Sequence, residues 1–215
     1  SPTARAFSLK LACWNALERN DDIDQAIEDR EAALLKDAGE DPRRQAAALV
    51  AIGADCMGIG RFEQAEAVFR RAVELDPAAR SALSAALSAQ KKTAAALSEA
   101  IALFDAQPTQ GAAMAVFQVL TAMKAEELKS NADVDPFLAK AVELFPNDVR
   151  ILLEAAATRI RQDRGDDSIG LYEKVLTIAP NQPATLNNLA ALLSYKPQRQ
   201  EEALELVDKA LAALG

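Results

Sequence analysis

Few side chains in this chain of 215 residues are of the types that carry out catalysis or hold a metal ion. Histidine, the most frequent general base and zinc ligand, does not occur in the sequence. The two cysteines, Cys13 and Cys56, are too few for a structural zinc site and form no C-x-x-C motif. We expect both to be buried in helices, with a disulfide or a reactive thiol as the alternative. The sequence thus predicts no catalytic residue, cofactor or metal ion, and a protein that is not an enzyme.

Two short clusters contain residue types that bind ligands in other proteins. The glycines between Gly53 and Gly60 lack the lysine of a phosphate-binding loop and follow a helical stretch, so a helix crossing and a hairpin turn explain them. Asp163, Asp166 and Asp167 lie close together in the sequence and could suggest a metal site. A turn between two helices, capped by Asp166 or Asp167, explains these aspartates more simply.

The composition indicates an all-α protein. Half of the residues are hydrophobic, only 5% are aromatic, and alanine and leucine, which favour helices, dominate the apolar residues. The formal net charge of −8, from 24 basic and 32 acidic side chains, disfavours nucleic acid and anionic membranes as partners. No window of 18 residues is apolar throughout, so we expect a soluble protein, with the cytoplasm as the favoured location.

Prolines mark the ends of helical stretches at a nearly constant interval. Five of them follow one another at distances of 35, 31, 38 and 34 residues, each after an apolar pattern with helical spacing. The five are Pro42, Pro77, Pro108, Pro146 and Pro180. A fixed period in this range is typical of a helical repeat array.

The repeat is clearest between residues 46 and 77. The pattern reads Leu49-x2-Ile52-Gly53-x2-Cys56 in a first helix, then Ala65-x3-Phe69-x2-Ala72 in a second helix, then Pro77. Gly53 and Ala65 are small, as two closely crossing helices require, and Phe69 is large enough to fill the space between them. The sequence therefore predicts a hairpin of two helices.

This hairpin resembles the tetratricopeptide repeat (TPR), whose pattern is W-x2-L-G-x2-Y, then A-x3-F, then P. Leu49 stands in place of the tryptophan and Cys56 in place of the tyrosine. The other repeats are weaker copies. The first, read as Ala26-x3-Arg30-x2-Ala33, and the third both lack the bulky residue of the second helix.

The resemblance implies an all-α fold, a right-handed superhelical solenoid of about six antiparallel helix hairpins. We expect one repeat domain over residues 1–215, as a fragment of a longer protein, with units near 4–42, 43–78, 79–110, 111–147, 148–182 and 183–215. Helices are expected near 4–19, 22–37, 43–58, 62–75, 79–90, 93–106, 111–128, 133–144, 148–162, 166–178, 183–194 and 200–213. The last helix keeps apolar residues on several sides, so we expect further repeats or another domain to follow it.

The resemblance also implies a binding surface, because the first helix of each TPR hairpin lines a concave face where ligands usually lie. The residues that match this lining are Val50, Ala54, Met57, Val119, Met123, Leu153, Ala157, Asn187, Asn188 and Ala191. They are mostly apolar and small, which suits an amphipathic helix or an extended apolar peptide. The alternative is that some of them only pack against neighbouring helices.

Asn188 is the sharpest local feature of this surface. In TPR proteins with an asparagine at this place, the amide bonds a peptide backbone, because it offers both donors and an acceptor. The alternative is an amide on the helix surface that bonds water or the next repeat. The acidic chaperone tails that some TPR proteins clamp are not expected here, since apolar residues stand where that clamp needs lysines and asparagines.

The resemblance predicts an interaction scaffold or adaptor inside a larger bacterial protein, with a protein or peptide partner of unknown identity. One alternative is a regulatory or targeting arm of a larger enzyme. Another is a module that self-associates through the concave face or through the ends of the solenoid.

Overall fold

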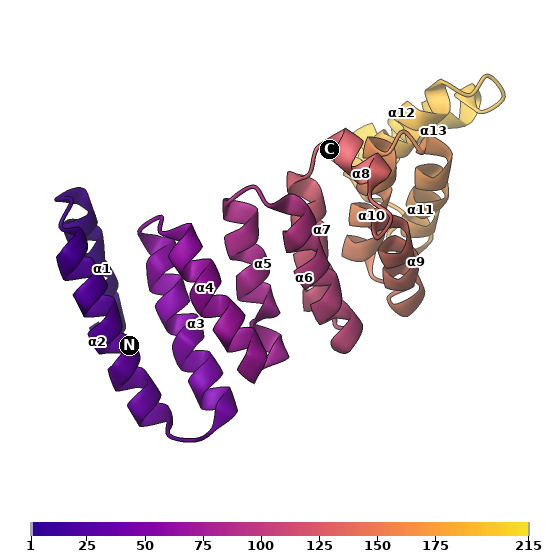
Figure 1. Cartoon of the computed structure of the whole chain (residues 1–215). Coiled ribbons are helices and arrows are strands. Elements are labelled where there is room, and N and C mark those ends of the chain that lie inside the picture. The colour runs from indigo at the N-terminus through magenta and orange to yellow at the C-terminus, as the bar shows by residue number, and fades with distance from the viewer. Residues whose placement is uncertain (1, 215) are drawn as a thin grey trace. The chain divides into compact units, whose positions relative to one another are not determined.

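The computed structural model describes residues 2–214 of the chain and the side chains of residues 4–213. All regular elements in this part are helical, as the composition predicts (Figure 1). In chain order they are α1 (Pro2–Ala16), α2 (Asn20–Ala38), α3 (Pro42–Gly58), α4 (Phe62–Leu75), a 3-10 turn (Pro77–Ala79), α5 (Arg80–Ala89), α6 (Thr93–Ala106), α7 (Gln110–Ala122), α8 (Ala125–Ser130), α9 (Val134–Leu144), α10 (Val149–Arg161), α11 (Gly165–Ile178), α12 (Pro183–Ser194) and α13 (Gln200–Leu214).

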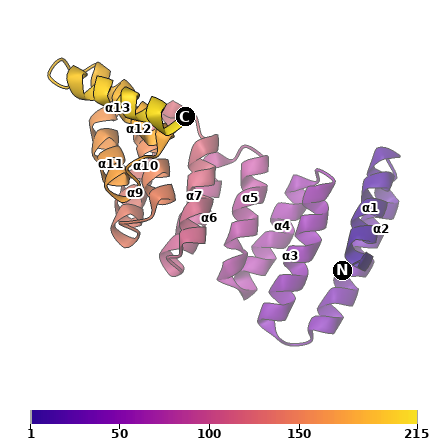
Figure 2. The same cartoon turned by 180° about the vertical axis from the view of Figure 1, so that it is seen from behind.

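The helices form two compact units, Ser1–Gln107 with α1–α6 and Pro108–Gly215 with α7–α13. Within each unit, the chain folds as antiparallel helix hairpins, and the two helices of a hairpin such as α3 and α4 lie side by side in both views (Figure 1, Figure 2). The fold is thus the predicted array of helix hairpins. The predicted single domain over residues 1–215 stays a prediction.

The crossing of α3 and α4 depends on a residue without a side chain. An added Cβ at Gly53 would lie 2.3 Å from Cε1 of Phe69, well inside van der Waals contact. Phe69 itself is only 2% exposed and Ala65 is completely buried. The expectation that small residues allow the crossing and that Phe69 fills the space is confirmed for this hairpin.

Two other hairpins place a serine at the same crossing and use it as a hydrogen-bond donor. Ser84 Oγ of α5 donates to the carbonyl of Ala96 in α6 at 2.8 Å. Ser168 Oγ of α11 donates to the carbonyl of Ala156 in α10 at 3.0 Å. Both hydroxyls are buried, and each is satisfied by the backbone of the facing helix. The close approach therefore also brings a backbone carbonyl within reach of the facing helix.

The first hairpin has a different alignment from the predicted one. Ala33 is exposed, whereas Ile23 and Ile27 are 0% and 3% exposed, so the buried pattern of α2 starts three residues earlier than Ala26. The predicted alignment relied on the repeat period, and α2 has 19 residues where α4 has 14. Because of this extra length, the proline is a poor guide to the start of α2.

Arg30, predicted at the place of the bulky residue, instead forms a largely buried ion pair. Its Nε atom lies 2.9 Å from Oδ2 of Asp55 in α3, and Asp55 is 8% exposed. Ser8 Oγ of α1 donates to the other carboxylate oxygen of Asp55 at 2.8 Å. The Arg30 guanidinium also covers the ring of Phe7 at 4.3 Å. These side chains join α1, α2 and α3, and no local pattern in the sequence indicates this contact.

The turn inside the hairpin has the same conformation in four repeats. A residue with φ between 56° and 78° precedes a basic residue, whose N–H donates to the carbonyl five residues earlier. The four pairs of residues are Glu18–Arg19, Gly60–Arg61, Lys91–Lys92 and Asp163–Arg164. The predicted caps Asp166 and Asp167 are wrong, because α11 begins after Arg164 without a side-chain cap.

The basic residue of the turn also links neighbouring hairpins in three places. Each ion pair reaches the second helix of the preceding repeat, and the pairs are Arg61–Asp24, Lys92–Glu66 and Arg164–Asp135. Glu66 also accepts hydrogen bonds from Arg70 on its own helix and from Gln90. The turn thus holds its own hairpin closed and fixes it to the preceding one.

The predicted helix over residues 111–128 is wrong, because it is two helices. α7 ends at Ala122, and Met123 and Lys124 have extended backbones before α8 begins. The N–H of Lys124 donates to the Glu127 carboxylate at 2.9 Å, which starts the new helix. Arg161 of α10 donates to the carbonyls of Leu120, at 2.7 Å, and Met123. A partner outside the segment stabilises this break, so the local pattern does not reveal it.

Replacing Gly53 by alanine is expected to lower the free energy of unfolding by about 1–3 kcal/mol, because the new methyl group overlaps the Phe69 ring. Gly58 in the last turn of α3 is the matched control, since nothing lies within 4 Å of a Cβ there. Alanine at Gly58 should be neutral or stabilising by up to about 1 kcal/mol. Urea denaturation measures both, and equal effects of the two changes would contradict the crossing model.

Replacing Glu66 by glutamine should lower the free energy of unfolding by about 1–2 kcal/mol near neutral pH. Hydrogen bonds from Lys92 and Arg70 lower the pKa of Glu66 from 4.5 to about 2, so its charged form stabilises the folded state. This contribution is complete above about pH 4.5 and is lost as the pH falls toward about 2. Urea denaturation between pH 7 and pH 3 should therefore show the variant approaching the wild type. Glu74→Gln, an exposed change on the same helix, should show no such convergence.

Candidate functional site

The predicted binding residues of the first unit form a strip on α3. Val50, Ala54 and Met57 are four and three residues apart, which places them on one face of the helix. Ala54 is exposed, and Val50 and Met57 are partly buried. This strip is accessible to a partner.

The two predicted residues of α7 do not offer such a surface. Val119 is 4% exposed and Met123 is 3% exposed, so both belong to the core of the second unit. Met123 also lies after the end of α7, where its carbonyl accepts a hydrogen bond from Arg161. The prediction assumed that the helix continues through Met123, and the break removes that face. We therefore exclude Val119 and Met123 from the candidate site.

The predicted residues of α10 and α12 differ in their access to solvent. Leu153 packs partly buried against the core between α10 and α13, whereas Ala157 is exposed. Asn187 and Ala191 of α12 are also exposed. All three exposed side chains are available to a partner.

Asn188 uses part of its amide inside the protein. Its Nδ2 atom donates to the hydroxyl of Tyr172 on α11 at 3.3 Å. Burial raises the pKa of Tyr172, so this hydroxyl stays protonated at neutral pH. The bond joins the fifth and sixth repeats, which favours the alternative in which the amide serves the array itself.

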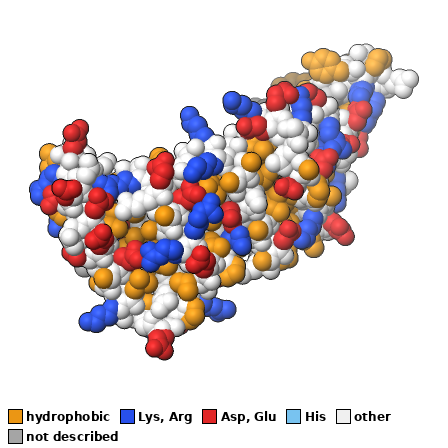
Figure 3. Space-filling view, in the orientation of Figure 1, with side chains coloured by type: hydrophobic (Ala, Val, Ile, Leu, Met, Phe, Trp, Pro, Cys, Tyr) orange, Lys and Arg blue, Asp and Glu red, His pale blue; other side chains and the backbone are white. Residues whose placement is uncertain are grey.

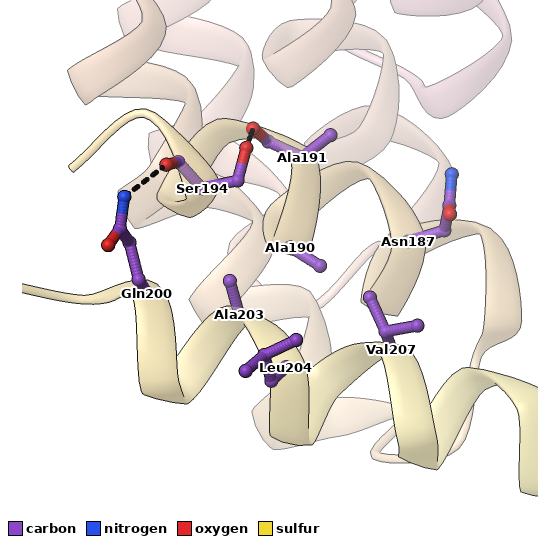
Figure 4. Close-up of a pocket in the computed structure, with 8 residues that line it drawn as sticks. All are labelled: Asn187, Ala190, Ala191, Ser194, Gln200, Ala203, Leu204 and Val207. Carbon is purple, nitrogen blue, oxygen red and sulfur yellow. Dashed lines mark hydrogen bonds between the residues drawn. The ribbon is translucent and has the colours of Figure 1, made fainter. Parts of the chain in front are cut away.

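An apolar hollow of about 380 Å³ lies between α12 and α13, and the helical pattern of the sequence does not indicate it (Figure 4). We name it the α12–α13 hollow. Its lining consists of Asn187, Ala190, Ala191, Ser194, Gln200, Ala203, Leu204 and Val207. Two of the predicted residues, Asn187 and Ala191, belong to this lining.

Small residues create the α12–α13 hollow. Ala190 and Ala203 face each other where the two helices meet, and larger residues such as Leu189 and Leu206 point into the core instead. At one end, Gln200 Nε2 donates to the Ser194 carbonyl at 3.2 Å (Figure 4). The polar groups at that end thus bond one another, and the rest of the hollow presents mainly carbon to solvent.

Large apolar side chains continue the hollow along α13. Leu204 is 66% exposed, Val207 is 38% exposed and Leu211 is 62% exposed. Their spacing of three and four residues puts them on one face of the helix. A second row of α13 residues is buried in the core, so apolar side chains lie on two sides of this helix. The expected further repeats or domain stay a prediction.

Acidic side chains lie beside the apolar row on the surface of α13. Glu201, Glu205 and Asp208 are exposed on the side of the helix that turns away from α12. Glu202 differs, because hydrogen bonds from Arg199 lower its pKa and hold it against the start of α13. The solvent-facing side of α13 next to the hollow therefore carries three carboxylates and one cation, Lys209.

The charged residues elsewhere are largely paired with one another. On the face of the first unit that Figure 3 shows, acidic and basic side chains are interleaved. The three clustered aspartates each face a cation, in the pairs Asp163–Lys129, Asp166–Lys196 and Asp167–Arg164. Within the described residues, no group of three or more histidine, cysteine or acidic side chains is arranged to hold a metal ion.

The two cysteines have different environments. Cys56 is buried, and burial raises the pKa of its thiol to about 11, so it stays a neutral thiol near neutral pH. Cys13 is exposed on α1, which corrects the expectation that both are buried. Among the described helices, none has the length and apolar character needed to cross a bilayer.

Comparison with known proteins identifies the fold. No family model and no curated protein matches the chain. Among solved structures, YrrB, "a TPR protein with an unusual peptide-binding site", is 22% identical over 78% of this chain and 86% of that chain, with a TM-score of 0.56. MamA from Desulfovibrio magneticus RS-1 is 17% identical over 81% of this chain and 96% of that chain, with a TM-score of 0.58. The chain therefore has the fold of the tetratricopeptide-repeat proteins.

Proposed function

We propose that this chain is a protein-interaction module that binds a helix or an apolar peptide segment. The observation that carries this proposal is the α12–α13 hollow, because it combines an apolar lining with exposed leucines and a negative border. Contiguous apolar surface of this kind marks interaction sites in soluble proteins. The net charge of −8 makes nucleic acid a poor partner.

The chemistry of the hollow selects an amphipathic helix with basic flanks. An apolar side chain in the hollow would be removed from water, which contributes about 2 kcal/mol for one leucine. Glu201, Glu205 and Asp208 would attract lysine or arginine on the flank of such a helix and repel acidic residues. This recognition mode is that of a helix in a groove.

The predicted strip on α3 is a second surface for the same function. Val50, Ala54 and Met57 remain accessible, and so does Ala157 on α10. The binding site named for YrrB shows that a similar fold holds a peptide in that protein. This likeness supports the proposal for the present chain and does not select between the two surfaces.

A synthetic helix tests the proposal. The probe is a fluorescein-labelled 18-residue amphipathic peptide with leucines along one face and lysines beside them, and its partner probe carries glutamates instead of the lysines. We expect fluorescence anisotropy to show binding of the lysine peptide with a dissociation constant between about 1 and 100 μM. The glutamate peptide should bind at least about tenfold more weakly.

Variants locate the binding surface. Leu204→Glu should weaken binding of the lysine peptide at least about tenfold, because it places a charge in the apolar lining. Leu144→Glu on α9 is the matched control, since Leu144 is 46% exposed and lies outside the hollow. The hollow is rejected if Leu204→Glu binds as well as the control. Loss of binding in Ala54→Glu instead would assign the peptide to α3.

A further inference from the structure

Neighbouring hairpins inside each unit pack in a recurring way. The first helix of a hairpin packs on the second helix of the preceding hairpin, as α3 does on α2, α5 on α4 and α12 on α11. The outward faces of α13, a second helix, and of α1, a first helix, are of the kinds that meet in such a junction.

The outward face of α1 is apolar and basic. Leu9 is 66% exposed, and Cys13 and Ala16 are exposed on the same face, four and seven residues further along. Arg5 and Lys10 are exposed on the two sides of this row. No acidic residue occurs in α1. The side of α1 opposite the buried Leu11 thus carries a short apolar row with cations beside it.

The outward face of α13 is its counterpart. Leu204, Val207 and Leu211 have the same three- and four-residue spacing, and the carboxylates beside them have the opposite charge. Among the described leucines, those more than 60% exposed are Leu9, Leu17, Leu204 and Leu211. All four lie on α1, directly after it, or on α13. The most exposed leucines therefore belong to two faces with complementary charge.

We propose that α1 of one copy of this chain seats on the α12–α13 hollow of a second copy. The contact repeats the packing of a first helix on a preceding second helix, now between two molecules. This proposal rests on the proposed function of the hollow, and it identifies α1 of a second copy as the helix that binds there. Because the two faces are different, the contact is head-to-tail, and each added copy leaves one face of each kind open. The oligomers therefore grow with concentration.

Sedimentation velocity over a concentration series tests the contact. We expect the average mass of the wild-type chain to rise above 23.0 kDa with concentration. Leu9→Glu and Leu211→Glu should each weaken association at least about tenfold. Both side chains are exposed, so neither change disturbs the core. Leu144→Glu, a change of the same kind on α9, should associate like the wild type.

Mixing the two variants distinguishes this contact from a symmetric one. The Leu9→Glu chain keeps an intact α13, and the Leu211→Glu chain keeps an intact α1. Their mixture should therefore form a dimer of twice the monomer mass and nothing larger. Trp14 is the only tryptophan and lies on α1, so its emission should change in the mixture and not in either variant alone. A symmetric contact between two α13 helices would leave Leu9→Glu associating, which overturns the proposal.

Charge reversal tests the electrostatic part of the contact. The double variant Arg5→Glu, Lys10→Glu should weaken association at least about tenfold, because it places anions against the acidic border of α13. Lys36→Glu, Arg43→Glu is the matched control, with the same change in net charge at exposed places on α2 and α3. Equal weakening by both variants would contradict a specific contact.

The outcomes separate this inference from the proposed function. A chain that binds the lysine peptide at Leu204 but stays at 23.0 kDa at every concentration refutes self-association and leaves the interaction module in place. A chain that neither binds the peptide nor associates refutes both. A peptide of residues 2–17 is the direct probe of the contact. It should bind the Leu9→Glu chain and fail to bind the Leu211→Glu chain.

Discussion

The close crossing of two helices inside each hairpin is the constraint on which the rest of the structure depends. At Gly53 the facing ring leaves no room for a methyl group, and at Ser84 and Ser168 the same crossing brings a hydroxyl to the opposite backbone. A hairpin that closes in this way buries one row of apolar side chains between its two helices. It leaves a second apolar row exposed on its outer side. The second row needs a neighbouring hairpin, so stacking follows from the crossing rather than from a separate signal.

Electrostatics then fixes how neighbours stack. The basic residue after the left-handed turn residue lies where its own hairpin closes. In three of the four turns its side chain reaches an acid on the preceding hairpin, as Lys92 reaches Glu66. The turn conformation and the junction between repeats are therefore coupled through one residue. The Arg30–Asp55 pair adds a second tie in the first unit and is shielded from solvent. Because the pair is shielded, removing either partner would lower the free energy of unfolding, since the other charge would stay buried without its partner.

Much of the fold could be predicted from the sequence, because small residues at the crossing and prolines after second helices are local signals. The features that were missed depend on distant partners. The end of α7 needs Arg161, 38 residues beyond Met123, and the start of the buried row in α2 is hidden by the length of that helix. Fewer features of the candidate site could be predicted from the sequence. Exposure depends on packing, so a helical pattern could not show that Val119 is covered or that the hollow lies between α12 and α13.

The break after α7 also explains why the interval from Pro108 to Pro146 is the longest of the series. The extra length is folded into α8, a helix of six residues, while Phe117 of α7 and Phe137 of α9 still pack with their ring centroids 5.1 Å apart. Gln162 of α10 donates to the Leu128 carbonyl and holds this added helix against the repeat. The repeat therefore absorbs an insertion without losing its periodicity. The loop around residues 130–133 is accordingly the natural place to graft a foreign segment into this fold.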